Sequence, residues 1–348
     1  MEEKLINMHK NDVIEKCNSS WNTPILAVRK SNDSLRIVQN YASSLNKVVE
    51  LPMFPIPNIR FTLQTVSEFI SKMRTDFNEE VVISTCDISS GFHCIPIRKQ
   101  DREYFAFVHR ATMWTFKRMT MGERGSPANF CQLMNEIFSE LSTEKTLITI
   151  YVDDILCVSA KSDAIRGLES VFKALSENNL ICSLTKCNFF QSSVTFLGYT
   201  VSTKGLAAIS NKLIEIAKYP MPKCLKSALR FCGITTYYTR FIPKLQLWLS
   251  PLQKLIGKKG QFEMTPEAIE GVREIQKSAE KGCHVHHLDY GKNIFVAADT
   301  SLHGIGGVVG NYDDLNESTK TMSNIKISAY TSRCLDAKEA LLSSRARE

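Results

Sequence analysis

The stretch Leu147-Ile-Thr-Ile-Tyr-Val-Asp-Asp-Ile-Leu-Cys-Val158 decides the fold. Apolar and β-branched residues on both sides of the acidic pair predict two strands, with Asp153 and Asp154 at the hairpin tip between them. Two adjacent carboxylates repel each other, and this repulsion costs stability unless cations bind there. Carboxylate oxygens are hard ligands that suit Mg²⁺ or Mn²⁺. For an isolated Asp-Asp pair, an ordinary acidic turn is the simpler interpretation.

A third acid strengthens the metal interpretation. Asp87 directly follows Val81-Val-Ile-Ser-Thr-Cys86, which is another run typical of a buried strand. Three acids at neighbouring strand ends would complete a site for two metal ions about 4 Å apart. One ion would activate an attacking oxygen, and the other would hold a triphosphate and stabilise the leaving group. The sequence therefore predicts a phosphoryl-transfer site.

Composition excludes several classes of protein. The 348 residues include 43 Lys and Arg against 36 Asp and Glu, a formal net charge of +7. This ordinary globular composition and length predict two or three domains. The charged N-terminus is no secretory signal, and no uncharged apolar run reaches the roughly 18 residues that indicate a membrane span. Eleven scattered cysteines without a C-x-x-C pair indicate reduced thiols inside a cell.

The charge is unevenly placed along the chain. Residues 201–262 contain eleven basic side chains and the single acid Glu215, so this segment carries +10 and the rest carries −3. A solvated helix face is the plain interpretation of such a cluster. Interleaved aromatic residues, such as Tyr237, Tyr238 and Trp248, favour a surface for a nucleic-acid backbone.

Apolar periodicity gives a coarse map of the elements. Strands are expected at 25–28, 35–38, 81–86 and 294–298, with a second one after Gly307, on both sides of the Asp pair, and as one strand over 194–201. Helices are expected at 61–75, 129–141, 163–178, 210–218, 223–238 and 264–281. Strands and helices mix throughout, so the class is α+β or α/β.

At this point the chain resembles the reverse transcriptase of gypsy-type LTR retrotransposons, and more distantly that of retroviruses. The resemblance is carried, in order, by Ser20-Trp-Asn-Thr-Pro24, Asp87-Ile-Ser-Ser-Gly-Phe-His-Cys-Ile95, Gly125-Ser-Pro-Ala-Asn-Phe130, Tyr151-Val-Asp-Asp154, Phe196-Leu-Gly198 and Tyr237-Tyr-Thr-Arg-Phe-Ile-Pro243. It implies the α+β fold of a right-hand polymerase, followed by a partial ribonuclease H-like α/β domain. Residues 1–205 would be fingers and palm, 206–285 a basic helical thumb and connection, and 290–348 the incomplete ribonuclease H-like domain.

The resemblance also implies roles for single residues. Asp87, Asp153 and Asp154 would bind two Mg²⁺ ions, with Mn²⁺ as a substitute. Arg36 and Lys30 would contact the triphosphate of a bound nucleotide, although a basic residue in a strand turn is often only solvated. Phe92 would close off the sugar 2′ position and favour deoxynucleotides, with core packing as its plain alternative. The residues that would position primer and template are Tyr151, Phe196, Leu197, Gly198, Lys223, Arg230, Arg240 and Lys244.

The C-terminal stretch resembles the start of a ribonuclease H domain. Asp299 would be its first metal-binding carboxylate and Glu348 the second. A working site of this kind needs further acids, so we expect an incomplete domain without ribonuclease H activity. One departure from the family lies in Thr120-Met-Gly-Glu-Arg124, where the family is largely apolar. Glu123 would be unfavourable near phosphates unless Arg124 offsets its charge.

Three functions stay open at this level. The first is an RNA-directed DNA polymerase that extends a primer 3′-hydroxyl with dNTPs on an RNA or DNA template, as part of a retrotransposon polyprotein. The second is an inactive retrotransposon relic that still binds nucleic acid. The third, a viral RNA-dependent RNA polymerase, usually has Gly before the Asp pair and lacks an aromatic gate, so Val152 and Phe92 count against it. We expect no membrane partner and a place inside the cell, in the cytoplasm, virus-like particles or the nucleus. The oligomeric state stays open.

Overall fold

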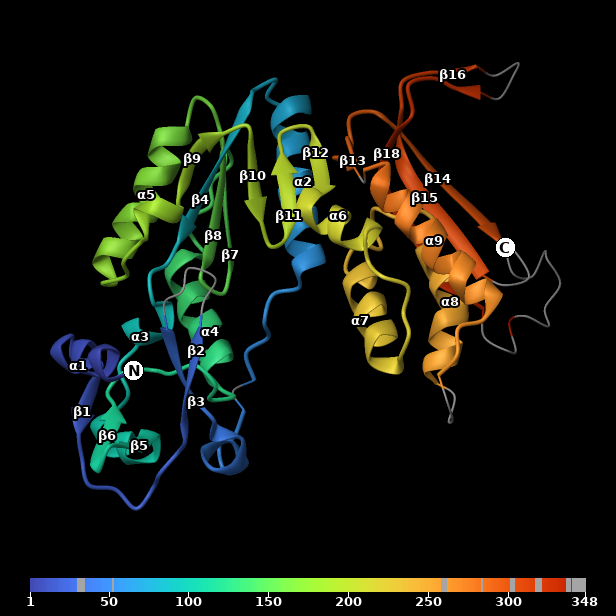
Figure 1. The fold of residues 1–348 in the computed structure, drawn as a ribbon. Helices are drawn as coiled ribbons and strands as arrows, with labels where there is room; N and C mark the ends of the chain where they lie inside the picture. The colour runs from blue at the N-terminus through green and yellow to red at the C-terminus, as the bar shows by residue number, and fades with distance from the viewer. Residues whose placement is uncertain are drawn as a thin grey trace. The chain divides into compact units, whose positions relative to one another are not determined.

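The computed structural model describes residues 1–29, 35–51, 53–257, 262–282, 284–300, 304–316, 321–335 and 339. The chain divides into two compact units (Figure 1). The first contains Met1–Thr62 and Ser84–Phe189, and the second contains Leu63–Ile83 and Phe190–Glu348. The predicted ranges 1–205, 206–285 and 290–348 stay predictions, because compactness does not test an assignment by function.

A four-stranded sheet carries the acids of the first unit. Its strands, in spatial order, are β7 (Thr146–Tyr151), β8 (Asp154–Ala160), β4 (Val81–Asp87) and β9 (Asn188–Gln191). The helices α4 (Ser126–Phe138) and α5 (Ala164–Glu177) place buried residues such as Phe130 and Val171 in one core with Ile155 of β8. The strand pair around Asp153-Asp154 was predicted, and its antiparallel register confirms it.

The remainder of the first unit consists of short elements. The helix α1 (Glu2–Lys10) precedes a sheet of β1 (Ile14–Lys16), β6 (Thr112–Phe116) and β5 (Ala106–His109). The strands β2 (Ile25–Arg29) and β3 (Leu35–Gln39) form a separate antiparallel pair, as predicted. The short helices are η1 (Tyr41–Ser43), η2 (Leu45–Lys47), α3 (Gly91–Cys94), η3 (Lys99–Phe105) and η4 (Leu184–Lys186).

The second unit contains two larger sheets. One has the order β10 (Ser193–Phe196), β11 (Tyr199–Ser202), β12 (Gly205–Ala208) and β13 (His284–His286). The other has the order β14 (Asn293–Thr300), β15 (Gly304–Tyr312) and β18 (Lys326–Cys334), with the small pair β16 (Leu315–Asn316) and β17 (Thr321–Met322) apart from it. The single strand predicted over 194–201 is wrong, because the chain turns at Leu197-Gly198 between β10 and β11.

Helices fill the rest of the second unit. They are most of α2 (Ile59–Thr75), then α6 (Ser210–Ala217), α7 (Leu225–Thr236), α8 (Leu245–Ile256) and α9 (Pro266–Glu280). The sequence did not predict α8, which contains Pro251 and packs against α7, α9 and β18. Its Leu245, Leu249 and Leu252 are fully buried, so tertiary packing holds this helix together despite the proline.

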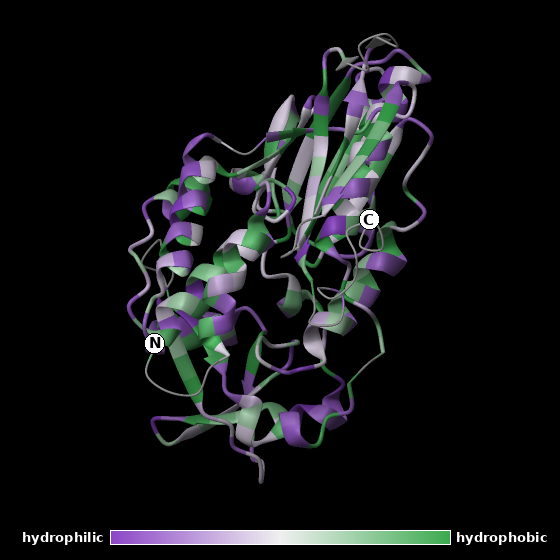
Figure 2. Cartoon of the chain, turned by 90° about the vertical axis from the view of Figure 1, so that its right-hand side faces the viewer, coloured by the Kyte–Doolittle hydropathy of each residue, from purple (hydrophilic) through white to green (hydrophobic). Residues whose placement is uncertain are grey.

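Hydrophilic residues interrupt the apolar ones along the helices of both units (Figure 2). Within the described residues, no helix combines the length and the apolar character needed to cross a membrane.

Candidate active site

The tip of the β7–β8 hairpin is a turn of two residues. Tyr151 pairs with Asp154, so Val152 and Asp153 form the turn between them. Val152 has a φ of 55°, in the left-handed region, while Asp153 does not. A positive φ at the first turn position is typical of a type II′ hairpin, where glycine is preferred. A β-branched residue there is a local strain, and it lies beside the acids of the site.

The backbone brings the end of β4 to this turn. The amide of Ile88, which follows Asp87, donates a hydrogen bond to the carbonyl of Asp153 at 3.1 Å. The side chains of Asp87 and Asp153 line one cavity of about 280 Å³. Burial, helped by the negative charges of Asp153 and Asp87, raises the pKa of Asp154. All three predicted metal-binding acids therefore act on one another at this place.

A cation that the sequence did not single out already pairs with one of the acids. Lys186 lines the same cavity, and its Nζ lies 2.9 Å from Oδ1 and 3.1 Å from Oδ2 of Asp87. Its positive charge partly opposes the rise in the pKa of Asp154. Lys186 is separated from Asp87 by about a hundred residues of chain, so no local sequence pattern predicts the ion pair.

The donor set of this cavity fits Mg²⁺. The three aspartates offer only hard carboxylate oxygens, and their mutual repulsion is relieved by bound cations. The ion pair of Lys186 with Asp87 shows that the cavity attracts positive charge. An ion bound at Asp87 would either share its carboxylate with the Lys186 ammonium group or displace that group.

Two further predicted residues line the cavity. Arg36 lies exposed on β3, and Phe92 is half-buried in α3. The Phe92 ring lies 5.2 Å from that of Phe130, at a tilt of 41°. Phe92 therefore packs on the core and also forms part of the cavity wall, so the two alternatives for it do not exclude each other. Lys30 lies outside the described residues.

Glu123 has a structural role that the sequence did not reveal. Its carboxylate is buried and accepts hydrogen bonds from the Gly125 amide at 2.6 Å and the Ser126 hydroxyl at 2.8 Å. It thereby supplies acceptors at the start of α4, where helix amides lack partners. Arg124 is not needed to offset it, since its amide and guanidinium both donate to Asn46.

Comparison with known proteins identifies the family. The model of the family "Reverse transcriptase (RNA-dependent DNA polymerase)" matches residues 28–201, half of the chain. The chain belongs to the reverse transcriptase family. The predicted membership is thus confirmed.

The chain is also similar to curated retrotransposon proteins. It is 27% identical over 306 residues to the Transposon Tf2-3 and Tf2-7 polyproteins of Schizosaccharomyces pombe. That alignment covers 88% of the chain but 22% of each relative, so the chain spans about a fifth of the length of these polyproteins.

Solved structures of the family share the fold. A foamy viral protease-reverse transcriptase in complex with an RNA/DNA hybrid matches with a TM-score of 0.77 and 25% identity, over 99% of this chain and 44% of that one. The same viral enzyme in a dRH form with double-stranded DNA gives 0.81 and 24%, over 99% and 57%. The predicted α+β right-hand polymerase fold is confirmed by these matches.

The hairpin that the family resemblance assigns to the primer lies in the second unit. Leu197 and Gly198 form its turn with φ values of 49° and 77°. The hydroxyl of Tyr237 donates to the Leu197 carbonyl at 2.5 Å, and that of Tyr238 donates to the Gly198 carbonyl at 3.3 Å. Two motifs of the reverse transcriptase resemblance therefore hold each other in place. Phe196 is buried beneath the turn.

The predicted nucleic-acid contacts differ in their exposure. Lys223, Arg230 and Lys244 are exposed, and Tyr151 is half-buried. Arg240 donates through Nε to the Ser328 carbonyl at 3.3 Å, so its guanidinium contacts β18 within the second unit. Roles in primer or template binding stay predictions for all of them.

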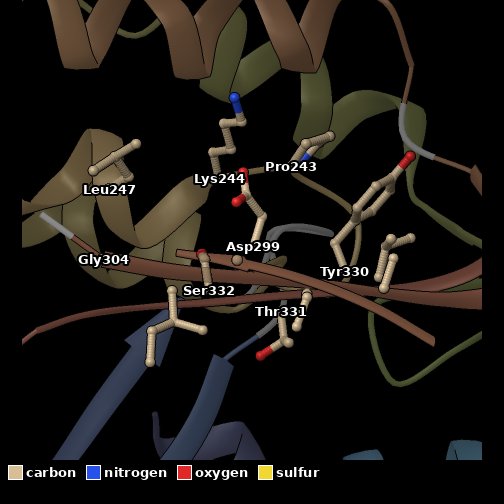
Figure 3. Close-up of a pocket in the computed structure, with 14 residues that line it drawn as sticks. Pro243, Lys244, Leu247, Asp299, Gly304, Tyr330, Thr331 and Ser332 are labelled. Atoms are coloured by element: carbon tan, nitrogen blue, oxygen red, sulfur yellow. The ribbon is translucent and has the colours of Figure 1, made fainter. Parts of the chain in front are cut away.

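Asp299 lines a different pocket, of about 310 Å³, in the second unit. Figure 3 shows Asp299 pointing from β14 toward the segment that carries Pro243 and Lys244, with Tyr330 and Ser332 beside it. Asp299 is exposed, and it is the one acid among the described residues that line this pocket. Glu348 lies outside the described residues.

Proposed function

We propose that this chain is an RNA-directed DNA polymerase that transfers nucleotides by a two-metal mechanism. The observation that carries the proposal is the single cavity that holds Asp87, Asp153, Arg36 and Phe92, with Asp154 electrostatically coupled to it. Membership in the reverse transcriptase family supports the same activity.

Each residue of the cavity has a task in this proposal. Asp87, Asp153 and Asp154 would hold two Mg²⁺ ions, and bound Mg²⁺ would supply activation of the primer 3′ oxygen and stabilisation of the leaving pyrophosphate. Arg36 binds phosphate oxygens of the incoming dNTP through its guanidinium fork. Phe92 would lie beside the sugar 2′ carbon of that dNTP, where a ribose hydroxyl would collide with its ring.

The nucleic-acid partner is proposed from charge and from the relatives. Residues 201–262 carry +10, a density of positive charge that favours contact with a phosphate backbone. The similar viral enzyme is described in complexes with an RNA/DNA hybrid and with double-stranded DNA. We propose that this chain binds a template with a primer and acts as part of a retrotransposon polyprotein.

Primer extension tests the proposal directly. The full chain is incubated with an oligo-dT primer on poly-rA, labelled dTTP and Mg²⁺, and product length is followed over time. We expect extension by the unmodified chain and at least a ~100-fold slower rate for Asp153→Asn, because the substitution removes a charged ligand without changing size. Asp76→Asn, at an exposed acid outside the cavity, is the matched control and should extend normally.

The same assay separates the proposal from an inactive relic. A chain that binds the hybrid in a salt-sensitive manner but never extends the primer would contradict polymerase activity and leave nucleic-acid binding as the function. Equal extension by the unmodified chain and Asp153→Asn would reject the assignment of the catalytic acids.

A further inference from the structure

Three cysteine thiols of the first unit converge beside the carboxylate cavity. Cys86 is buried at the end of β4, while Cys182 and Cys187 are half-buried on the segment that leads into β9. Their sulfur atoms all lie within 4.8 Å of one another. We propose that Cys86, Cys182 and Cys187 form a binding site for a thiophilic divalent cation of the zinc group, Zn²⁺ or Cd²⁺.

Backbone pairing holds the three thiols in place. Ile88 and Cys182 form an antiparallel bridge. On either side of it, the Ser89 amide donates to the Ile181 carbonyl at 2.7 Å, and the Ser183 amide donates to the Asp87 carbonyl at 2.9 Å. The 181–183 segment is therefore fixed against the end of β4. The sulfur atoms are brought together by the fold before any ion binds.

The spacing suits a metal–thiolate site. With Zn–S bonds of about 2.3 Å, tetrahedral geometry places sulfur atoms roughly 3.8 Å apart, so only a small inward movement is required. Thiolates are soft ligands that select Zn²⁺ over Mg²⁺. Three protein ligands leave a fourth position for water, as in other open zinc sites. Half-burial of Cys182 and Cys187 gives an ion access from solvent.

Core packing alone does not explain the cluster. A free cysteine is often buried as a small apolar side chain, as Cys131 and Cys157 are in this unit. Packing does not require three sulfurs at one point. Among the described residues, no other group of three or more His, Cys, Asp or Glu side chains has its ligand atoms this close, and Asp87, Asp153 and Asp154 do not either. The inference goes beyond the proposed polymerase, which uses hard oxygen ligands.

Cadmium titration of the full chain tests the site. Cd²⁺ bound to thiolates absorbs in the ultraviolet through charge transfer, with an intensity that grows with the number of sulfurs. The protein is kept in a phosphine reductant, which adds no competing thiol, and in excess Mg²⁺, which saturates carboxylate sites. We expect one tight equivalent with the intensity of three thiolates, and its loss on addition of Zn²⁺. Asp153→Asn should keep this signal, so failure of the polymerase proposal would be distinguishable from failure of this one.

Serine variants assign the ligands. Cys182→Ser and Cys187→Ser should each weaken Cd²⁺ binding at least ~100-fold, because each removes one of three thiolates. Cys224→Ser, at an exposed thiol of the second unit, is the matched control and should bind as the unmodified chain does. Circular dichroism checks that each variant is folded. Unchanged affinity in both triad variants, or an intensity of one thiolate per cadmium, would overturn the proposal.

A second measurement needs no variant. The unmodified chain is treated with iodoacetamide, with and without one equivalent of Zn²⁺, and alkylation is mapped by mass spectrometry. We expect zinc to protect Cys182 and Cys187 while Cys224 stays reactive. Equal labelling of Cys182 and Cys187 with and without zinc would contradict the site even if the serine variants fail to fold.

Discussion

Two pockets, one in each compact unit, contain acids that the sequence predicted as metal ligands, and they differ in what surrounds those acids. In the first, Asp87 and Asp153 share a cavity, and burial, helped by their negative charges, raises the pKa of Asp154. In the second, Asp299 lies exposed and the other described lining residues add no carboxylate. Metal catalysis needs several ligands at one point, so similarity to a motif becomes a site only where the fold makes the acids converge.

The largest expected difference between the two pockets is catalytic. Asp87→Asn should slow primer extension at least ~100-fold, because it removes a charged ligand from the convergent site. Asp299→Asn should leave extension unchanged. In the same preparations, cleavage of a labelled RNA–DNA hybrid should be absent in both the unmodified chain and Asp299→Asn.

The contrast between the two pockets would be wrong if Asp299 proved catalytic. Mg²⁺-dependent cleavage of the hybrid by the unmodified chain, lost in Asp299→Asn, would show that the second pocket also assembles a working metal site. Loss of extension in Asp299→Asn would show that this acid matters to the polymerase.

A second difference concerns the pH dependence of stability, since each unit buries a titratable group and the two pKa values are shifted in opposite directions. In the second unit His287 is 6% exposed, donates from Nε2 to the Ser202 carbonyl at 2.6 Å, and has a pKa lowered to about 4 by burial. Between pH 6.5 and about 4 the unfolded chain therefore binds more protons at this residue, and folding stability falls as pH falls. Asp154 has the opposite sign, because a raised pKa makes the folded state take up protons first as pH falls.

Substitution of His287 isolates this effect. From pH 7 to pH 5, the unmodified chain should lose about 2 kcal/mol of unfolding free energy through this residue, following the lowered pKa. His287→Gln should lack that part of the loss, whereas His284→Gln, at an exposed histidine, should retain it. Urea unfolding followed by circular dichroism at both pH values is the measurement. The same pH dependence in the unmodified chain and His287→Gln would show that folding does not lower the pKa of His287.

The parts of the fold and of the site that could be predicted are those that local sequence patterns determine. Apolar and β-branched runs on both sides of Asp153-Asp154 predicted β7 and β8, because such runs are typical of buried strands. The same rule failed at 194–201, since an apolar run continues through the Leu197-Gly198 turn and hides it. The helix α8 was not predicted. A proline such as Pro251 normally ends a helix, and only the burial of α8 against neighbouring elements overrides that preference.

Contacts between distant segments explain what the sequence missed. Glu123 looked unfavourable because its acceptor role depends on burial at the start of α4. Lys186 and the Cys182–Cys187 segment reach Asp87 and Cys86 only through strand pairing across about a hundred residues. No spacing rule links residues so far apart. The convergence of Asp87 with the Asp pair was predicted only because both follow strand-like runs.

The aromatic residues of the two pockets give a third comparison. Phe92 lines the carboxylate cavity, whereas Tyr330 lines the pocket of Asp299. Phe92→Val should increase incorporation of ribonucleotides relative to deoxynucleotides by about 10-fold, because one lost steric contact corresponds to roughly 1–3 kcal/mol of discrimination. Tyr330→Val should leave the ratio unchanged. Primer extension with ATP and dATP on poly-dT measures both, and an unchanged ratio in Phe92→Val would reduce Phe92 to a packing residue.

The smallest expected effect lies in the backbone of the two hairpin turns. The turn of β10 and β11 has a glycine at one of its left-handed positions, Gly198, whereas the β7–β8 turn places Val152 at a φ of 55°. Val152→Gly and Val152→Ala both lose the contacts of the valine methyl groups. The two variants therefore differ mainly in how easily the backbone adopts a positive φ. Glycine should be more stable by about 1 kcal/mol, since alanine keeps the Cβ that makes left-handed backbone costly. At Thr149, in the middle of β7, the order should reverse, with glycine less stable than alanine by roughly 0.5–1 kcal/mol. Urea unfolding of the four variants measures both differences, and the same order at the two positions would mean that the Val152 turn carries no strain.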